Sequence, residues 1–431
     1  MLDRFFHLKE KNTSIRKEFI GGVTTFLTMA YIIFLHPNML AETGMDKQAL
    51  ITVTCLASFA GTFLVALWAN VPFALAPGLG LNSFFTYSLV LGMGIDWPTA
   101  LGVVFISGIL FLLLTFLGFR EKLANAIPPS LRLAVPAGIG LLIAFIGFQN
   151  MGLIIKGENT ILKLGSLNGT VLMSLGGFLL IIFLELKKIK GSILVGILFI
   201  LFISIFLGYV HPPEAFFSTP PSMYPIAFQL NIGKALSIGL MGAIFSFLYV
   251  DLFDSLGTVI GCAYEADMVD KDGKIPKLDK ILGSDAIATM IGSLIGTSTI
   301  TTYVESASGI AAGARTGLAS IFTAILFLFA LFFAPVIGIV PGYATAPALI
   351  IVGIYMFKNI VNINFTRLTE GIPAFLTIIL MPFTSSISTG LAFGFISYIL
   401  LEVLTGNYRK ISLILWIIGL LSTLNLIIDL F

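Results

Sequence analysis

The segment GTSTITTYVESASGIAAGARTG, residues 296–317, interrupts a strongly apolar chain. It is rich in hydroxyl groups, is punctuated by glycine and carries one acid, Glu305. Apolar sequence enters it from Ile287 and leaves it after Leu318, so its spacing places it at membrane depth. Unpaired backbone groups are costly there, and a carboxylate is costly unless it faces a cavity or a partner. The segment is therefore predicted to line a polar cavity inside a membrane.

The composition is that of a polytopic membrane protein. Of the 431 residues, 57% are hydrophobic and 11% are charged, whereas soluble domains carry about 25% charged residues. The first eighteen residues are basic and lack the features of a cleaved signal peptide, so the first span is expected to be retained. Cys55 and Cys262 fall in apolar runs, where free cysteine behaves as a small hydrophobic residue. No Cys/His spacing typical of a metal site occurs, and none is expected.

Apolar runs of membrane-spanning length recur along the whole chain. Three of them, at 74–91, 303–313 and 371–384, are short or interrupted by Pro and Gly, which disfavours plain straight helices. A further apolar run at 411–430 either crosses the membrane or lies along it. The fourteen predicted spans lie near residues 19–36, 50–69, 74–91, 98–118, 132–149, 170–186, 191–208, 232–262, 281–296, 303–313, 316–336, 343–357, 371–384 and 386–404.

The distribution of Lys and Arg supports this span count. If the N-terminus is cytoplasmic and the chain alternates sides, almost all of the 24 basic residues fall on the cytoplasmic side. They include the clusters at Arg120–Arg132 and Lys271–Lys280. Positively charged loops are retained on the cytoplasmic side. The bias predicts a cytoplasmic N-terminus and indicates that 303–313 crosses the membrane.

The chain contains a weak internal repeat. A shift of about 231 residues superposes Ala57 on Ala288 and Gly61 on Gly292. It also brings Ala76–Asn82 onto Ala307 and the residues that follow. Each half thus has an interrupted segment in third place, and paired interruptions point to a transport site. Because seven is odd, the second half enters from the opposite face, which predicts an inverted repeat.

Four acids lie in predicted spans: Asp251, Asp254, Asp285 and Glu305. Asp251 and Asp254 share a helix face, and Gly257 and Gly261 would admit a neighbouring helix. Each acid has an ordinary structural alternative: one of Asp251 and Asp254 could cap or brace a broken helix, Asp285 could stabilise a helix N-terminus, and Glu305 could hold the backbone of its own segment. His7, His36 and His211 are expected in the tail or in outer loops. No phosphate loop or nucleophile arrangement indicates an enzyme, so uphill transport would use an ion gradient.

Several motifs resemble those of one family. They are residues 19–31 (FIGGVTTFLTMAY), 76–82 (APGLGLN), 251–258 (DLFDSLGT) and 296–317. Together they look like the AzgA-like purine permeases, a branch of the nucleobase:cation symporters related to the uracil and xanthine permeases. One departure is His36-Pro37-Asn38, which stands where relatives usually show Asn-Pro.

The resemblance implies an all-α polytopic fold with fourteen transmembrane segments in two inverted repeats of seven, and with short antiparallel strands before the half-helices of segments 3 and 10. It implies a core domain formed by 19–118 and 232–336 and a gate domain formed by 119–231 and 337–410. Residues 1–18 would be a cytoplasmic tail and 411–431 an additional C-terminal segment.

The resemblance also implies a purine–proton symporter of the cytoplasmic membrane that needs no cofactor and binds no nucleic acid. A homodimer is among the oligomeric states left open. The base would lie between the half-helices, with Glu305, Asp251 and Asn82 as ligands beside Gly78, Ala307 and Ser308. Asp251, Asp254 and Glu305 would couple transport to protons. An amide such as Asn82 can donate and accept at once, although an interhelical hydrogen bond is an equal use. The alternatives are a sulfate-type anion exchanger, a uracil or xanthine transporter of the same fold, and a structural membrane protein.

Overall fold

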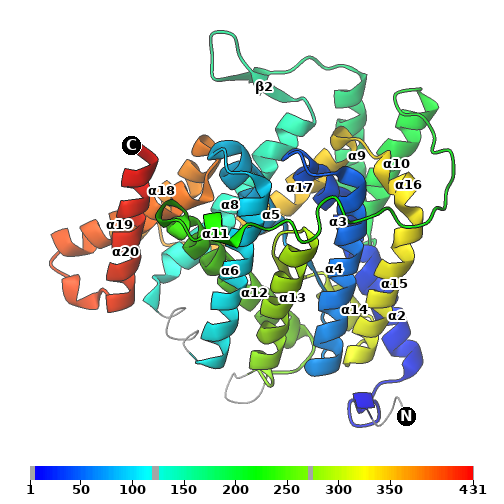
Figure 1. The fold of residues 1–431 in the computed structure, drawn as a ribbon, viewed down its shortest axis with the longest axis horizontal. Helices are drawn as coiled ribbons and strands as arrows, with labels where there is room; N and C mark the ends of the chain where they lie inside the picture. The colour runs from blue at the N-terminus through cyan, green and yellow to red at the C-terminus, as the bar shows by residue number, and fades with distance from the viewer. Residues whose placement is uncertain (1–4, 119–125, 270–274, 431) are drawn as a thin grey trace.

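The computed structural model describes residues 5–118, 126–269 and 275–430. Within these ranges nine helices are long and apolar enough to cross a membrane. Shorter apolar helices, the less apolar helix Leu278–Ile295 and the short helix Ser306–Ala311 complete two consecutive series of seven segments. Figure 1 shows how the helices are arranged. The predicted all-α polytopic architecture is confirmed. The expectations that concern Arg120, Lys271 and Lys274, and the domain boundary at residue 119, lie outside the described residues.

The first series is interrupted in its first and third segments. The break in the first falls at Ala30 and Tyr31, between two helices. The third contains a strand, a short helix and a π-helix, as the Pro and Gly residues at 74–91 predict. The elements are α2 (Ile15–Met29), α3 (Ile32–Ala41), α4 (Lys47–Trp68), β1 (Leu75–Pro77), α5 (Leu79–Ser83), η1 (Phe84–Gly92), α6 (Trp97–Phe116), α8 (Pro129–Asn150), a hairpin of β2 (Ile154–Lys156) and β3 (Leu162–Leu164), α9 (Gly169–Leu186) and α10 (Ser192–Phe206).

The second series repeats this plan with its interruption again in third place. Its first span begins at Met241, later than the predicted residue 232, because two short helices precede it. The elements are α11 (Ile232–Ala235), η2 (Ile238–Leu240), α12 (Met241–Glu265), α13 (Leu278–Ile295), β4 (Ile300–Thr302), α14 (Ser306–Ala311), α15 (Gly317–Ala330), η3 (Leu331–Phe333), α16 (Ala334–Gly338), α17 (Gly342–Phe357), η4 (Lys358–Asn362), α18 (Leu368–Thr384), α19 (Ile387–Leu404), η5 (Tyr408–Lys410) and α20 (Leu413–Leu430).

Helix packing follows the repeat. Helix α4 packs against α15, and its counterpart α13 packs against α6. Helices α4 and α13 also pack on each other, and they stand side by side in Figure 1. Their small residues permit this approach: a Cβ added to Gly61 would lie 3.1 Å from the Ala288 Cβ. The small residues matched by the repeat therefore lie where the two halves meet.

A second group of helices packs together beside this one. Helix α8 packs against α17 and α18, α18 packs against α19, and α9 and α10 contact α17. Glycines again set the spacing, since a Cβ on Gly140 would lie 2.5 Å from the Gly353 carbonyl oxygen and 2.8 Å from the Met356 Cβ, both on α17.

Glu18 anchors α2 to the start of α15. Its side chain is fully buried, and its two oxygens accept hydrogen bonds from the backbone N–H groups of Arg315, Thr316 and Ala319 at 2.9, 3.3 and 3.2 Å. The first N–H groups of a helix have no partner within the helix, and they carry the positive end of its dipole. The Glu18 carboxylate thus satisfies three N–H groups at and just before the start of α15 and links α2 to it, while Gly317 donates to Asn70.

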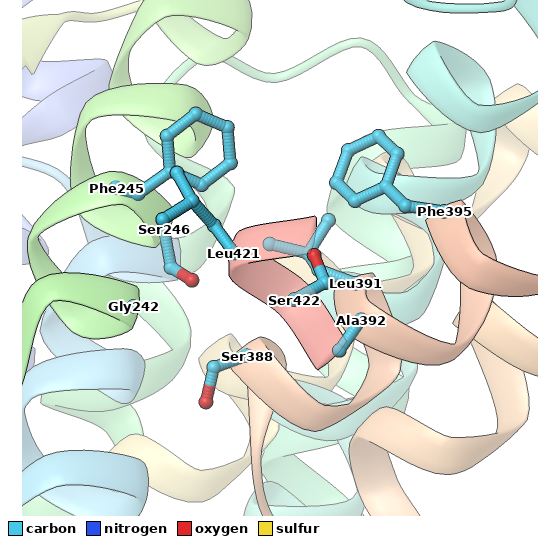
Figure 2. A pocket seen from close by; sticks show the side chains of 9 residues that line it. All are labelled: Gly242, Phe245, Ser246, Ser388, Leu391, Ala392, Phe395, Leu421 and Ser422. Carbon is cyan, nitrogen blue, oxygen red and sulfur yellow. The ribbon is translucent and has the colours of Figure 1, made fainter. Parts of the chain in front are cut away.

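The C-terminal helix α20 packs on α19 and on α12. Figure 2 shows the small pocket that remains between the three helices, with Phe245 and Phe395 on opposite sides and Leu421 and Ser422 contributed by α20. Most of the run at 411–430 therefore forms one helix, Leu413–Leu430, that touches both groups of helices.

Two glycines of α12 do not have the role expected from the sequence. A Cβ added to Gly257 or to Gly261 would meet no atom within 4 Å. The expectation that they admit a neighbouring helix is wrong, because this face of α12 points to open space. The close approach occurs instead at Gly309 of α14, where an added Cβ would lie 2.5 Å from the backbone oxygen of Gly21 and would also collide with the Thr25 hydroxyl.

We predict that Gly309→Ala destabilises the folded protein by about 1–3 kcal/mol, because the methyl group overpacks the contact between α14 and α2. The measurement is the melting temperature of the purified protein in detergent. Gly261→Ala is the control, since its methyl group meets nothing and alanine favours the helix by about 0.5–1 kcal/mol. A Gly309→Ala variant that melts with the wild type would contradict this account of the contact.

Candidate transport site

Strands β1 and β4 cross at the centre of the molecule as an antiparallel pair. Leu75 lies opposite Thr302, and Pro77 lies opposite Ile300. The pairing continues at both ends: the Gly78 N–H donates to the Thr299 carbonyl at 3.1 Å, and the Tyr303 N–H donates to the Ala74 carbonyl at 2.9 Å. The unwound backbone of each repeat is thus satisfied by the other repeat. The antiparallel strands expected before the two half-helices are confirmed.

A cavity of about 1130 Å³ lies in front of this crossing. Residues at the starts of both half-helices face it, namely Gly78 to Gly80 before and within α5, and Val304 and Glu305 before α14. The other walls come from α12, α8 and α17. These walls include Phe253, Asp254, Gly257, Thr258, Arg132, Leu133, Pro136, Ile139, Val352, Tyr355 and Met356.

The mouth of the cavity lies at the end of the molecule that holds the N-terminal segment. Thr115 near the end of α6 and Asp279 at the start of α13 belong to its lining. Near the start of α13, the Lys277 ammonium donates to the Ala69 carbonyl at 3.0 Å, and the neighbouring Asn70 amide donates to the Phe6 carbonyl at 3.3 Å. The cavity therefore opens on the same side as the N-terminal segment.

Glu305 presents a carboxylate to the cavity. It is partly exposed, and its Oε1 accepts a hydrogen bond of 2.5 Å from the hydroxyl of Tyr31. Tyr31 is buried at the break between α2 and α3, and it also belongs to the cavity lining. Asp254 of α12 is a second acid in the same lining.

Comparison with known proteins places the chain in a family. The model of a permease family, Xan_ur_permease, matches residues 16–393. This chain belongs to the Xan_ur_permease family. The expectation of a transporter rather than an enzyme is thereby confirmed, as is the recognition of the nucleobase permeases by their motifs.

Two relatives match the chain over almost its full length. The adenine permease AdeP of Escherichia coli is 41% identical, with 99% of this chain and 96% of that protein covered. The guanine/hypoxanthine permease PbuG of Bacillus subtilis is 43% identical, with 96% of each chain covered.

A solved structure confirms the fold. The transmembrane domain of the cyanobacterial bicarbonate transporter BicA covers 86% of this chain and 96% of its own, with a TM-score of 0.65 and 16% identity. The Xan_ur_permease chain thus has the seven-plus-seven inverted-repeat fold that the sequence predicts.

Three of the predicted site residues of this permease line the cavity, namely Gly78, Asp254 and Glu305. Asp251 is only 1% exposed and does not belong to the lining; the Ser255 hydroxyl lies 3.4 Å from its Oδ1. Among the acids of α12, the structure therefore brings Asp254, and not Asp251, to the cavity.

The other predicted residues lie behind the half-helix starts. Asn82 is fully buried, and its side-chain oxygen accepts a hydrogen bond from the Ser298 hydroxyl. Ala307 and Ser308 of α14 are partly exposed but lie outside the cavity lining. The carbonyl of Ser308 accepts a hydrogen bond of 3.1 Å from the Lys190 ammonium, in the loop between α9 and α10.

The expectation for His36 is wrong. It lies inside α3, fully buried, because the helix continues through Pro37. Its two ring nitrogens are 2.7 Å from the Thr54 hydroxyl and 2.8 Å from the Thr297 hydroxyl. Proline usually ends a helix, but α3 continues through Pro37 to Ala41.

Asp285 lies deeper than the sequence suggests. It is fully buried in α13 and accepts a hydrogen bond from the Thr302 hydroxyl of β4 at 2.9 Å. Asp285 thereby braces the strand crossing. Tyr31 and Arg132, which also line the cavity, were not selected from the sequence. Tyr31 does fall within the family-like motif at 19–31, which was the one available signal.

We predict that Gly257→Cys is labelled by a soluble maleimide in the purified protein, because this position lines the cavity. Ser255→Cys should stay unlabelled, since Ser255 is fully buried on the same helix. The native thiols of Cys55 and Cys262 are buried, so the wild type is expected to remain unlabelled. Mass spectrometry of the intact protein measures the labelling, and equal labelling of the two variants would contradict the assigned rotation of α12.

Proposed function

We propose that this permease carries purine bases, adenine or 6-oxopurines such as hypoxanthine and guanine, across the cytoplasmic membrane together with protons. The observation that carries the proposal is the Glu305 carboxylate, which lies at the start of a half-helix and faces a cavity large enough for a base. Relatives of both kinds, an adenine permease and a guanine/hypoxanthine permease, support the same substrate class.

The chemistry of the cavity suits a purine. The Glu305 oxygen that Tyr31 does not hold has two lone pairs, so it can accept N–H groups of the base. Tyr31, Phe253, Tyr303 and Tyr355 also belong to the lining, and aromatic rings stack favourably on a flat heterocycle. The cavity therefore combines acceptors for ring N–H groups with aromatic faces.

Proton coupling would use the acids of the same cavity. Glu305 and Asp254 both line it, and intramembrane carboxylates commonly serve as proton carriers. Asp251 stays part of the proposal only as a buried neighbour of Asp254 on α12. Uptake of a proton by one carboxyl would accompany uptake of the base, and its release would follow on the cytoplasmic side.

The transport movement would occur between the two groups of helices. Gly78, Asp254 and Glu305 face the cavity from the group built on α4 and α13, the proposed core domain. Arg132, Ile139 and Tyr355 face it from the group built on α8 and α17, the proposed gate domain. With a cytoplasmic N-terminus, the cavity mouth is the inward-open side. A shift of one group against the other would then move access to the opposite face.

The expected result for Glu305→Gln is loss of uptake of radiolabelled hypoxanthine and adenine, down to the level of cells without the protein. The amide retains the size of the side chain but replaces one acceptor by a donor, which leaves a base N–H unpaired. Uptake is measured in cells that lack their own purine permeases. Glu158→Gln, in the exposed β2–β3 hairpin outside the cavity, is the control.

Normal accumulation by Glu305→Gln would refute the assignment of the site. Saturable sulfate or bicarbonate uptake that purines do not inhibit would favour an anion transporter of the same fold. Such a transporter is expected to carry a basic residue at the half-helix starts, where this chain carries Glu305.

A second expectation concerns the driving ion. Purine uptake should collapse when a protonophore removes the proton gradient and should be unchanged when sodium is replaced by potassium. The measurement is initial uptake in proteoliposomes with imposed gradients. Uptake that follows a sodium gradient at equal pH on both sides would contradict proton coupling.

A further inference from the structure

We propose that Tyr31 is a positioning residue for transport: its hydroxyl holds one oxygen of Glu305, directs the other toward the substrate and sets how readily the carboxylate exchanges its proton. This inference rests on the proposed function of Glu305 and adds a residue and a role to it. The observation behind it is the hydrogen bond of 2.5 Å between the Tyr31 hydroxyl and Glu305 Oε1, across 274 positions of sequence.

The position of Tyr31 follows from the break in the first segment. Helix α2 ends at Met29 and α3 begins at Ile32. Tyr31 stands between them, 2% exposed, and its backbone carbonyl accepts from the N–H groups of Phe34 and Leu35 at 3.1 Å each. The first turn of α3 thus holds the backbone of Tyr31, while its side chain reaches the cavity.

Tyr31 and Glu305 are attached to helices that are packed against each other. Helix α14, which follows Glu305, packs directly on α2. The contact is as close as backbone allows, since the Gly309 Cα faces Gly21 and Thr25 with no room for a Cβ. A hydrogen bond between residues on rigid, contacting elements keeps its geometry and loses little conformational freedom on forming.

The other tyrosines of the cavity are engaged elsewhere. The Tyr303 hydroxyl donates to the Pro77 carbonyl at 2.5 Å, and the Tyr355 hydroxyl donates to the carboxylate of Glu185. Of the tyrosine hydroxyls that line the cavity in the described part of the chain, Tyr31 is the one that donates to Glu305.

Several ionisable groups surround Glu305, and their charges and hydrogen bonds affect its proton exchange. They are Asp254 and Cys262 on α12, Tyr303 just before α14, Tyr355 on α17 and Tyr31 itself. Asp254 is an acid, so its negative charge opposes a second negative charge on Glu305. The Tyr31 hydroxyl has the opposite effect, because a donated hydrogen bond stabilises the charged carboxylate.

The two oxygens of the Glu305 carboxylate would therefore have different roles. Oε1 is occupied by Tyr31, and the partly exposed side chain leaves its second oxygen for the cavity. Without the Tyr31 hydroxyl, Oε1 would lose this hydrogen bond, and the charged carboxylate would lose the stabilisation that it provides. Both substrate binding and the pH dependence of transport should then change.

The experiment compares the pH profiles of adenine and hypoxanthine uptake for the wild type and Tyr31→Phe in proteoliposomes. The phenylalanine keeps the ring packing and removes only the donor. The alkaline limb of the profile is expected to move by about one unit toward higher pH. Binding of the same base to the purified protein should weaken by about tenfold. Tyr343→Phe is the control, since it removes a tyrosine hydroxyl bonded to Ser204 at 3.0 Å, outside the cavity lining.

A double variant separates this inference from the proposed function. In a Glu305→Gln background, Tyr31→Phe should cause no further loss of purine binding, because the bond it removes is already altered. If Tyr31→Phe leaves both the pH profile and the binding unchanged while Glu305→Gln abolishes uptake, the role of Tyr31 is refuted and the proposed function stands. If Glu305→Gln transports purines normally, the proposed function fails first. Equal effects of Tyr31→Phe and Tyr343→Phe would reveal a general loss of folding and would also overturn the inference.

Discussion

The pairing of β1 with β4 is the contact on which the rest of the structure depends. A chain that unwinds at membrane depth exposes backbone N–H and C=O groups, and no water is present there to satisfy them. The backbone groups of β1 and β4 instead form hydrogen bonds with each other, from Leu75 to Pro77 and at the flanking residues Gly78 and Tyr303. Neither repeat could keep its broken segment without the other, so the crossing also explains why the two series of seven form one unit.

Polar side chains strengthen the same junction. Tyr31, His36 and Asn82 of the first repeat bond to Glu305, Thr297 and Ser298 of the second. The Ser306 hydroxyl accepts a hydrogen bond from the Ala74 N–H at 3.0 Å. Buried polar groups cost free energy unless they are paired, and here the pairing occurs between the repeats. The site is therefore a product of the interface between repeats, to which the polar stretch at 296–317 contributes Thr297, Ser298, Glu305 and Ser306.

The cavity lies where the two groups of helices meet. One group presents the half-helices and the acids, and the other presents Arg132 and Tyr355 across from them. Helix α20 contacts α12 of the first group and α19 of the second, so it covers part of the seam near the start of α12, before the α12 residues that line the cavity (Figure 2). In the proposed transport cycle, a movement at this seam would alter the cavity and the packing of α20 together.

The sequence by itself determined the class of protein, the positions of most spans, the paired interruptions and the place of Glu305 in one of them. These features are local, since apolar length, Gly and Pro breaks and a lone acid can be read within one segment. The tertiary structure decided which acid of α12 faces the cavity. Asp251 and Asp254 differ by about 60° around the helix, given roughly 100° per residue, and only the packing of α12 sets which of these directions is open. It also placed Tyr31 on Glu305 and buried His36 between two threonines, because those partners come from distant segments that meet only in the folded chain.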